Sequence, residues 1–179
     1  MKLCYIDCEA NLKYIWQLAA ILEIAGKEVT TFNSVVKEIN LGVPNSKLDK
    51  LSLEAIEKYP LSKEVFGKFK AFLAKYIDPY NKLDKAFFVG FNARFDADFV
   101  RVWFEANGDI HFGSWFWYPP IDIMQLAAIK LMKERSELPN FKLSTVCQHF
   151  GIEFDETTAH DALYDIQKTR ELWQKLSVI

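Results

Sequence analysis

Leu3-Cys4-Tyr5-Ile6-Asp7-Cys8-Glu9 is an apolar run that ends in two carboxylates. The run predicts a buried β-strand, on which residues i and i+2 point to the same face of the sheet. The side chains of Asp7 and Glu9 therefore converge on one spot. Because two like charges placed together are unfavourable unless a cation neutralises them, the pair predicts a divalent metal site. A solvated polar strand end is the alternative for an isolated Asp-x-Glu pair.

Length and composition indicate a globular protein. The chain has 179 residues, of which 50% are apolar and 26% are charged, and this length predicts one domain spanning residues 1–179. The three cysteines, Cys4, Cys8 and Cys147, have no paired spacing, so the sequence contains neither a zinc motif nor a disulfide framework. No apolar run reaches membrane-spanning length and the N-terminus lacks a signal peptide, so we expect a soluble cytoplasmic protein without membrane contact.

The charge balance restricts the kind of nucleic-acid partner. The formal net charge is −2, which creates no strong field toward phosphate. This argues against a protein that coats long nucleic acid non-specifically. It is compatible with an enzyme that grips one end of a strand locally.

The densest aromatic patch is Trp115-Phe116-Trp117-Tyr118, which precedes two prolines. We expect it to pack in the core or to anchor a loop. Base stacking or a contact surface is the alternative.

Three strands are predicted in the first part of the chain. Apolar patterns predict strands at residues 2–8 and 14–24, and a turn leads to a third strand at 27–32. Short connections of this kind favour an antiparallel meander. A loop is predicted around residues 44–46.

The rest of the chain predicts helices and one short strand. Helical spacing of apolar residues predicts a helix at 62–77 with Ser62 as its N-cap, and a shorter helix at 51–58. A buried strand is predicted at 86–89. Further helices are predicted at 95–107, 122–133, 143–150 and 159–176. Strands followed by helices, with a late short strand, indicate an α/β fold in which helices flank a mixed sheet.

A third carboxylate follows the late strand. The stretch Gly90-Phe91-Asn92-Ala93-Arg94-Phe95-Asp96 leads from this strand into a helix and places Asp96 near the helix start. Ligands gather at this end of the strands in α/β proteins. Asp98 is a rival, but it lies about 200° round the helix from Asp96, so only one of them can face a given site. A first-turn acid that merely favours the helix dipole is the alternative for Asp96.

A histidine and two acids open the last predicted helix. Asp165 lies within that helix, and His160 lies in its first turn or in the preceding loop, from which it can reach a neighbouring site. Asp161 and Asp165 are one turn apart on the same face, and periodicity does not decide between them. An exposed surface residue is the alternative for His160.

Taken together, three motifs resemble the DEDDh family of 3′→5′ exonucleases. They are Asp7-x-Glu9, the Asp96 that follows the Gly-x-Asn turn, and His160-x4-Asp165. The likeness extends over essentially the whole chain and is weakest at residues 32–80. Three further segments resemble the family's second strand, its Asp-containing segment before a helix, and the helix and turn before the last motif: Ile15–Ile21, Ile121–Leu126 and Leu143–Ile152.

The resemblance implies a fold, an activity and a cofactor. The fold is ribonuclease H-like, with the antiparallel three-strand meander and parallel strands in one mixed sheet. The activity is hydrolysis of phosphodiester bonds at the 3′ end of single-stranded DNA or RNA, with release of nucleoside 5′-monophosphates. The cofactor is a pair of divalent cations. Mg²⁺ or Mn²⁺ is expected because these hard cations prefer oxygen ligands such as carboxylates. A homodimer and association with a polymerase are both compatible with this family.

The same resemblance implies a role for each motif residue. Asp7 would bridge both cations, Glu9 and Asp165 would complete the site of the cation that activates water, and Asp96 would serve the second cation. His160 would act as general base.

Several other residues receive predictions. The family often has threonine after Glu9 and a glycine soon afterwards, whereas residues 10–14 contain neither. Residues expected to contact the substrate are Ala10, Asn11, Trp16, Asn92 and Phe95, with Phe91 as a further stacking candidate and Lys13, Arg94 and Arg101 as candidates for the strand backbone. Core packing or a solvated surface is the alternative for these side chains. Cys8 is expected to be a buried, inert thiol on the opposite strand face, Asp122 a helix cap, and His111 and His149 structural or exposed.

Two other functions remain open. A non-catalytic module that binds nucleic acid or protein could retain this fold, although a binder has no need for so many converging charges. An unrelated globular protein, with these acids as surface caps, would show no cooperative metal binding.

Overall fold

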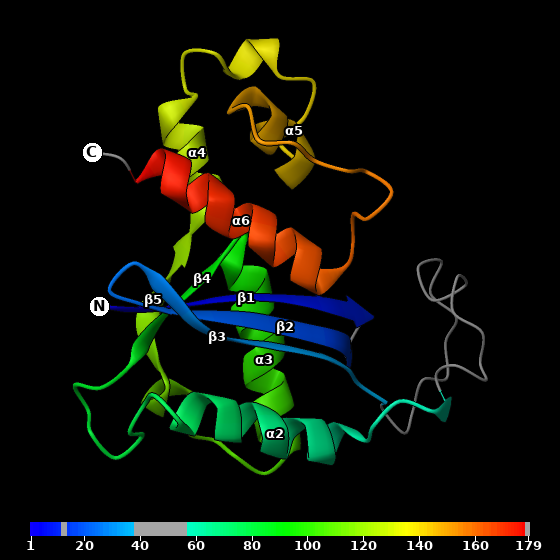
Figure 1. Ribbon diagram of the computed structural model, residues 1–179, viewed down its shortest axis with the longest axis vertical. Coiled ribbons are helices and arrows are strands. Elements are labelled where there is room, and N and C mark those ends of the chain that lie inside the picture. The colour runs from blue at the N-terminus through cyan, green and yellow to red at the C-terminus, as the bar shows by residue number, and fades with distance from the viewer. Residues whose placement is uncertain (12–13, 38–56, 178–179) are drawn as a thin grey trace.

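The computed structural model describes residues 1–11, 14–37 and 57–177, and for Asn11 it describes the backbone alone. These residues form a five-stranded mixed sheet with the strand order β3-β2-β1-β4-β5 (Figure 1). The strands are β1 (Lys2–Asn11), β2 (Tyr14–Ile24), β3 (Lys27–Val35), β4 (Ala86–Gly90) and β5 (Phe116–Asp122).

β1 is the central strand of this sheet. It pairs antiparallel with β2 and parallel with β4, while β2 pairs antiparallel with β3 and β4 pairs parallel with β5. The predicted three-strand meander and the mixed α/β sheet are therefore confirmed. The first and third strands are longer than predicted and continue to Asn11 and Val35.

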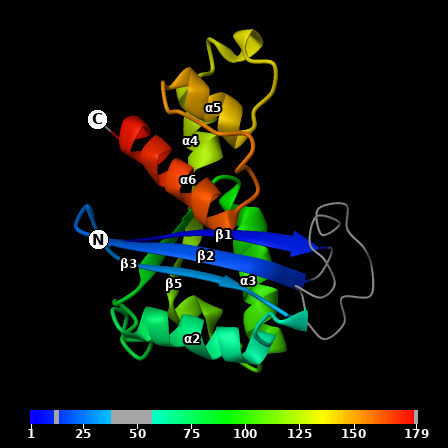
Figure 2. The same cartoon turned by 45° about the vertical axis from the view of Figure 1, so that its right-hand side comes forward.

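Helices cover both faces of the sheet. They are α2 (Ser62–Ala74), α3 (Ala93–Ala106), α4 (Ile123–Lys130), α5 (Leu143–His149) and α6 (Ala162–Leu176), with short 3-10 turns η2 (Phe112–Ser114) and η3 (Arg135–Glu137). Figures 1 and 2 show α2 and α3 on one side of the sheet and α4, α5 and α6 on the other. No helix in the described part of the chain is long and apolar enough to cross a membrane.

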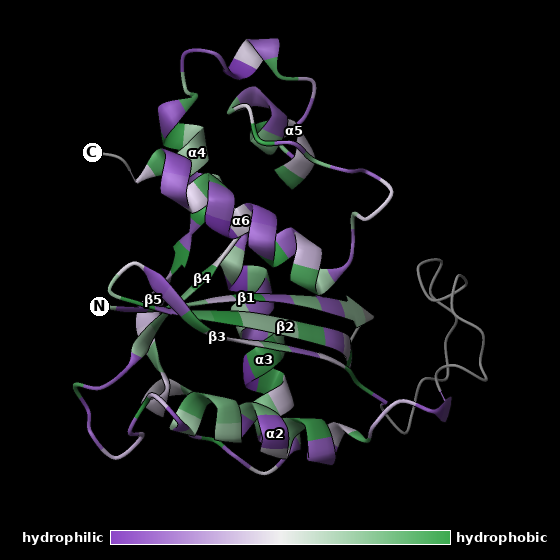
Figure 3. Ribbon diagram, viewed as in Figure 1, coloured by the Kyte–Doolittle hydropathy of each residue, from purple (hydrophilic) through white to green (hydrophobic). Residues whose placement is uncertain are grey.

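Alternation along β1 separates two hydrophobic cores. Cys4, Ile6 and Cys8 face the layer of α2 and α3, whereas Leu3 and Tyr5 face the layer of α4, α5 and α6. β2 is apolar along most of its length and is buried between the two layers (Figure 3). Continued alternation directs the two β1 carboxylates toward the α6 side.

β5 is a strand that the sequence analysis did not predict. Its segment contains Pro119 and Pro120, and proline cannot donate a hydrogen bond to a neighbouring strand. β5 lies at the edge of the sheet, where proline is tolerated, and its pairing with β4 is irregular. Trp115 and Phe116 are buried, which confirms core packing for that half of the aromatic patch, while Tyr118 is exposed.

Some predicted boundaries and one predicted cap are wrong. α2 ends at Ala74, α4 ends at Lys130 and α6 begins at Ala162, so all three are shorter than expected. Ser62 is not an N-cap: its Oγ accepts hydrogen bonds from the side chains of Trp103 and Asn107 on α3. The helix predicted at 51–58 and the loop at 44–46 lie mainly or wholly outside the described residues.

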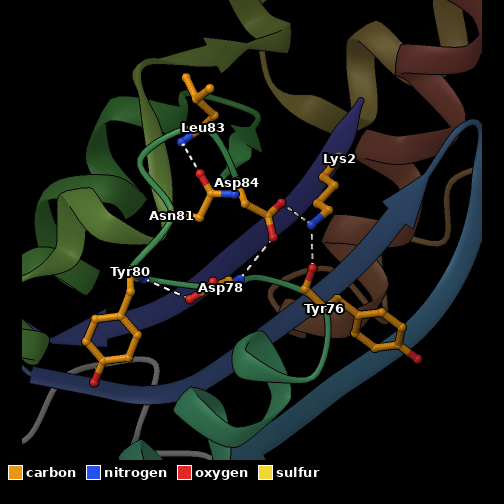
Figure 4. Close-up of polar contacts among 7 residues, drawn as sticks. All are labelled: Lys2, Tyr76, Asp78, Tyr80, Asn81, Leu83 and Asp84. Carbon is orange, nitrogen blue, oxygen red and sulfur yellow. Dashed lines mark hydrogen bonds and ion pairs between the residues drawn. The ribbon is translucent and has the colours of Figure 1, made fainter.

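The connection from α2 to β4 is tied to the start of β1 (Figure 4). The Lys2 ammonium donates to the carbonyl oxygen of Tyr76 and to the carboxylate of Asp84. The other oxygen of Asp84 accepts from the backbone N–H of Asp78 at 3.0 Å, which closes the loop on itself. These bonds hold the entry to β4 beside the beginning of β1, the strand with which β4 pairs.

Candidate active site

The two β1 carboxylates lie on the sheet face that α6 covers. Asp7 pairs with Ala19 of β2 and Glu9 pairs with Gln17, and the register shifts immediately after Glu9. Ala19 belongs to the core beneath α4, α5 and α6. Glu9 is buried, with 7% of its surface exposed, and Asp7 is half-buried. The predicted convergence of this pair on one face is confirmed.

Hydrogen bonds at the start of α6 give Asp161 and Asp165 different roles. Asp161 is the N-cap, and its side chain accepts a hydrogen bond from the backbone N–H of Tyr164 at 3.0 Å. Asp165 lies in the first turn and accepts from the backbone N–H of His160 at 3.2 Å. His160 itself precedes the helix with a φ of 70°, a left-handed conformation that is uncommon for a residue with a side chain. The loop and the first turn of α6 therefore act as one unit.

Three side chains from these two regions meet. One potential ligand atom from each of Glu9, His160 and Asp165 lies within 4.8 Å of the others. The first turn of α6 lies over β1 in both views of the fold (Figures 1 and 2). The two carboxylates offer the hard oxygen ligands that divalent cations such as Mg²⁺ prefer, and the imidazole lies beside them. The structure thus contains a candidate metal site that spans β1 and α6.

Asp96 reaches β1 from the other helical layer. It lies in the first turn of α3, is 4% exposed, and accepts hydrogen bonds on Oδ1 from the backbone N–H of Cys8 at 3.0 Å and from its Sγ at 3.3 Å. A Cβ at Gly90 would lie 3.2 Å from the carbonyl oxygen of Ile6, so glycine allows this close approach of the β4–α3 turn to β1. Asp96 is therefore joined to the backbone between Asp7 and Glu9.

The surroundings of Asp96 oppose its ionisation. The pKa of Asp96 is raised to about 7 as the net result of three influences: burial, the largest, raises it, hydrogen bonds such as those from Cys8 lower it, and the nearby carboxylate of Asp122 raises it. Asp98, its rival on the same helix, is exposed and faces Arg94 at 3.7 Å. Of these two aspartates, only Asp96 lies beside β1, in line with the prediction from the helical angle that they cannot face the same site.

Two neighbours of Asp96 agree with their predicted roles. Asp122 is the N-cap of α4, accepts from the backbone N–H of Met124, and also accepts from that of Asn92, both at 3.0 Å. Cys8 is buried on the opposite strand face from the β1 carboxylates. Burial and then the charge of Asp96 raise the pKa of the Cys8 thiol, which keeps it neutral. Its hydrogen bond to Asp96 was not predicted.

The predicted substrate contacts occupy different environments. Trp16 is only 9% exposed, so its ring is largely covered by protein, in line with the alternative of core packing. Phe95 is 48% exposed, and its ring lies 4.7 Å from that of Phe99. Asn92 is exposed at the N-cap of α3, and Ala10 is half-buried beside the register shift in β1. The side chain of Asn11 lies outside the described part of the structure.

The structure also shows the environments of most of the residues predicted to contact the nucleic-acid strand and of the two remaining histidines. Lys13 lies outside the described residues, and Phe91 is half-buried against the core beneath α6. Arg94 is exposed, and Arg101 lies over the ring of Phe112 at 5.3 Å. His111 and His149 are both exposed, as predicted, and His149 faces Glu134 at 3.0 Å.

Gln17 is a residue of this region that the sequence analysis missed. It is 6% exposed and bonds to the beginning of α6. The available signal was one polar amide within the otherwise apolar stretch Ile15–Ile21. Its place opposite Glu9 depends on strand register, which the sequence does not reveal.

Comparison with known proteins identifies the family. The RNase T family model, described as "Exonuclease", matches residues 5–172. The chain belongs to this exonuclease family. Ribonuclease T of Hahella chejuensis is 36% identical over 93 residues, which are 52% of this chain and 39% of that protein. Ribonuclease T of Shewanella denitrificans is 32% identical over 89 residues, or 50% of this chain and 36% of that protein. The match thus spans less than half of either relative.

Solved structures of exonucleases share the fold of this family member. Cell-death related nuclease 4 superposes with a TM-score of 0.71 at 16% identity, over 98% of this chain and 63% of that one. The nuclease domain of 3′hExo, described as a DEDDh family member bound to rAMP, gives 0.68 at 16% identity, over 96% and 88% of the two chains. The ribonuclease H-like fold that the resemblance implied is therefore confirmed.

Proposed function

We propose that this exonuclease-family chain hydrolyses phosphodiester bonds from the 3′ end of DNA or RNA and releases nucleoside 5′-monophosphates. The observation that supports this proposal is the meeting of Glu9, His160 and Asp165 at the face where Asp7 also points. The DEDDh description of a structural neighbour supports the 3′→5′ direction. Single-stranded ends are the proposed substrate because the net charge of −2 offers little attraction to long duplexes.

The proposed cofactor is a pair of Mg²⁺ or Mn²⁺ ions held by the four acids. Asp7 and Glu9 of β1 and Asp165 of α6 would bind from the α6 side, and Asp96 would bind from the first turn of α3. When bound, such cations supply an activated water and stabilise the negative charge that develops on the leaving 3′-oxygen. The chain's own contribution is to bring Glu9 of β1 and Asp165 of α6 together and to hold Asp96 of α3 against Cys8 of the same strand.

His160 is the proposed general base. Its side chain is exposed, so water can reach the imidazole, and its backbone is tied to Asp165. An imidazole commonly titrates at about pH 6.5 and can accept a proton from an attacking water near neutral pH. Adjacent carboxylates would stabilise the imidazolium that forms. The left-handed backbone of His160 supports this assignment, because strained conformations gather at functional sites.

Phe95 is the proposed stacking residue for a terminal base. It is the most exposed of the three aromatic candidates Trp16, Phe91 and Phe95, and it directly precedes Asp96 in the chain. Base stacking on an aromatic ring tolerates any base, which suits an enzyme that shortens strands stepwise.

The proposal is tested with 5′-labelled single-stranded DNA and RNA of matching sequence. Each is incubated with Mg²⁺, with Mn²⁺ or with chelator, and the products are separated by length. We expect metal-dependent shortening from the 3′ end, and a loss of roughly 10²–10⁴-fold in His160→Gln. Asp98→Asn, an exposed acid on α3, is the matched control and should cut like wild type. Shortening that persists in chelator would contradict the proposal.

A further inference from the structure

We propose that Gln17 is a positioning residue that sets the first turn of α6, and with it His160 and Asp165, against the strand that carries Glu9. This inference deepens the proposed exonuclease function and rests on it. The residue belongs to β2, outside the segments that contain the proposed ligands and base.

The side-chain amide of Gln17 joins three elements. Nε2 donates to Oδ2 of Asp161 at 3.0 Å and to Oδ1 of Asn33 on β3 at 3.3 Å. Oε1 accepts from the backbone N–H of Ala162 at 3.4 Å. Both amide hydrogens and the carbonyl oxygen are therefore used, which is the requirement for a buried amide. Its orientation follows from its partners, since a carboxylate only accepts and a backbone N–H only donates.

These contacts act where the site is assembled. Asp161 is the N-cap of α6 and Ala162 is its first residue, whose N–H has no partner within the helix. His160 immediately precedes this pair, and Asp165 follows one turn later. Gln17 is the register partner of Glu9 on the adjacent strand. The amide therefore links the start of α6 to the neighbour of the Glu9 position, and a shift at Gln17 would move two members of the three-residue cluster.

A second tie between α6 and the sheet lies further along the helix. Arg170 Nε contacts Glu23 of β2 at 2.9 Å, and Arg170 Nη1 contacts Glu28 of β3 at 3.4 Å. These two ion pairs hold the middle of α6 and lie more than one turn beyond Asp165. It provides a control that loosens the same helix on the same strands without changing the bonds at the helix start.

The test exchanges donor and acceptor between Gln17 and Asp161. Gln17→Glu places a carboxylate against the Asp161 carboxylate, and Asp161→Asn places an amide against the Gln17 amide. The double variant pairs a Glu carboxylate with an Asn amide, retains an N-cap, and has the same net charge as wild type. Each protein is assayed for Mn²⁺ affinity by calorimetry without substrate, and for the Mn²⁺ concentration that gives half-maximal hydrolysis.

We expect each single variant to weaken Mn²⁺ binding by about 10- to 100-fold, as for other residues that orient metal ligands. The double variant should recover most of this loss. Arg170→Met should lower the melting temperature and leave the Mn²⁺ dependence unchanged. Gln17→Met, which is apolar and similar in volume, provides the same comparison if Gln17→Glu does not fold.

Unchanged Mn²⁺ affinity in both Gln17 variants, or an unrecovered double variant, would overturn the inference. An equal change in Arg170→Met would assign the effect to general loosening of α6 and would overturn it as well. Failure of the proposed function is distinguishable, because wild type would then bind Mn²⁺ without cutting either substrate while the calorimetric series still reports on Gln17.

Discussion

Two buried aspartates at opposite ends of α3 have pKa values that are shifted in opposite directions. Asp96 lies in the first turn and is 4% exposed, and burial, with the carboxylate of Asp122, raises its pKa to about 7. Asp109 lies just beyond the last turn and is 9% exposed. Burial opposes its ionisation too, but hydrogen bonds from the Lys70 ammonium at 2.6 Å and the His111 backbone outweigh burial, and its pKa is lowered.

The opposite pKa shifts distinguish a buried carboxylate that the protein pairs with a cation of its own from one that has no such cation among its main partners. Asp109 has its cation within the fold, so its role is explained by stability alone. Among the described residues, the main influences on the pKa of Asp96 are burial, hydrogen bonds such as those from Cys8 and the carboxylate of Asp122, and none of them is a basic side chain. A buried acid that lies beside another carboxylate, with no basic side chain among its main partners, favours the approach of a cation from outside the chain.

The largest expected effect is on catalysis by Asp96→Asn. If Asp96 holds a cation, removing its charge should lower kcat/KM by at least about 100-fold, because the stabilisation that a bound metal gives is worth several kcal/mol. Asp109→Asn should leave kcat/KM close to wild type. Hydrolysis of a labelled oligonucleotide in Mg²⁺ measures both. Equal activity of Asp96→Asn and wild type would show that the difference between Asp96 and Asp109 has no bearing on catalysis.

The next effect is a pH dependence of stability without metal. The pKa of Asp96 is raised from 3.8 to about 7, so between these values the native state keeps a proton that the unfolded chain has lost. The free energy of unfolding should therefore be highest below about pH 4 with respect to this group, and should fall as pH rises to about 7, by an amount on the order of a few kcal/mol. Urea unfolding in chelator, with Asp96→Asn as the reference, measures this slope.

Ionisation of Asp109 should make the free energy of unfolding rise with pH, in a lower pH range than that of Asp96. Because the pKa of Asp109 is lowered from 3.8, its ionised form stabilises the fold above about pH 4, and this contribution is lost as pH falls through the lowered pKa. The same slope in wild type and Asp96→Asn between about pH 4 and pH 7 would contradict the assignment to Asp96.

A smaller effect is expected when the internal cation is removed. Lys70→Met keeps the packing of the side-chain stem but leaves Asp109 as a buried acid without its partner. We expect a loss of about 1–2 kcal/mol in the free energy of unfolding at neutral pH, less than for a fully buried pair because Lys70 is partly exposed. Urea unfolding measures the loss, and Asp109→Asn should be less destabilised than Lys70→Met. Activity should be unchanged in both variants.

The smallest effect is expected at Asp98. Its contact with Arg94 is exposed and 3.7 Å long, so Asp98→Asn should change the free energy of unfolding by less than about 0.5 kcal/mol. Thermal unfolding checks this value. A larger change would show that the surface of α3 carries an interaction beyond this ion pair.

Much of the fold followed from local pattern. Alternation and short turns predicted the β1–β2–β3 meander, and helical spacing predicted α2, α3 and α6. β5 was missed because the two prolines in Phe116–Asp122 argue against a strand, and only its place at the sheet edge makes them acceptable. Ser62 was misassigned because its hydroxyl is used by Trp103 and Asn107, which are distant in sequence.

The sequence by itself determined which candidate side chains share a face, because strand and helix periods place Asp7 with Glu9 and separate Asp96 from Asp98. It also determined the family, since the motifs occur in order along the chain. Tertiary structure decided which of Asp161 and Asp165 caps α6, that Asp96 is anchored to Cys8, and that Gln17 lies opposite Glu9. The cap depends on the residue at which α6 begins, and the other two outcomes depend on strand register and on a contact between segments more than 80 residues apart, for which local periodicity carries no information.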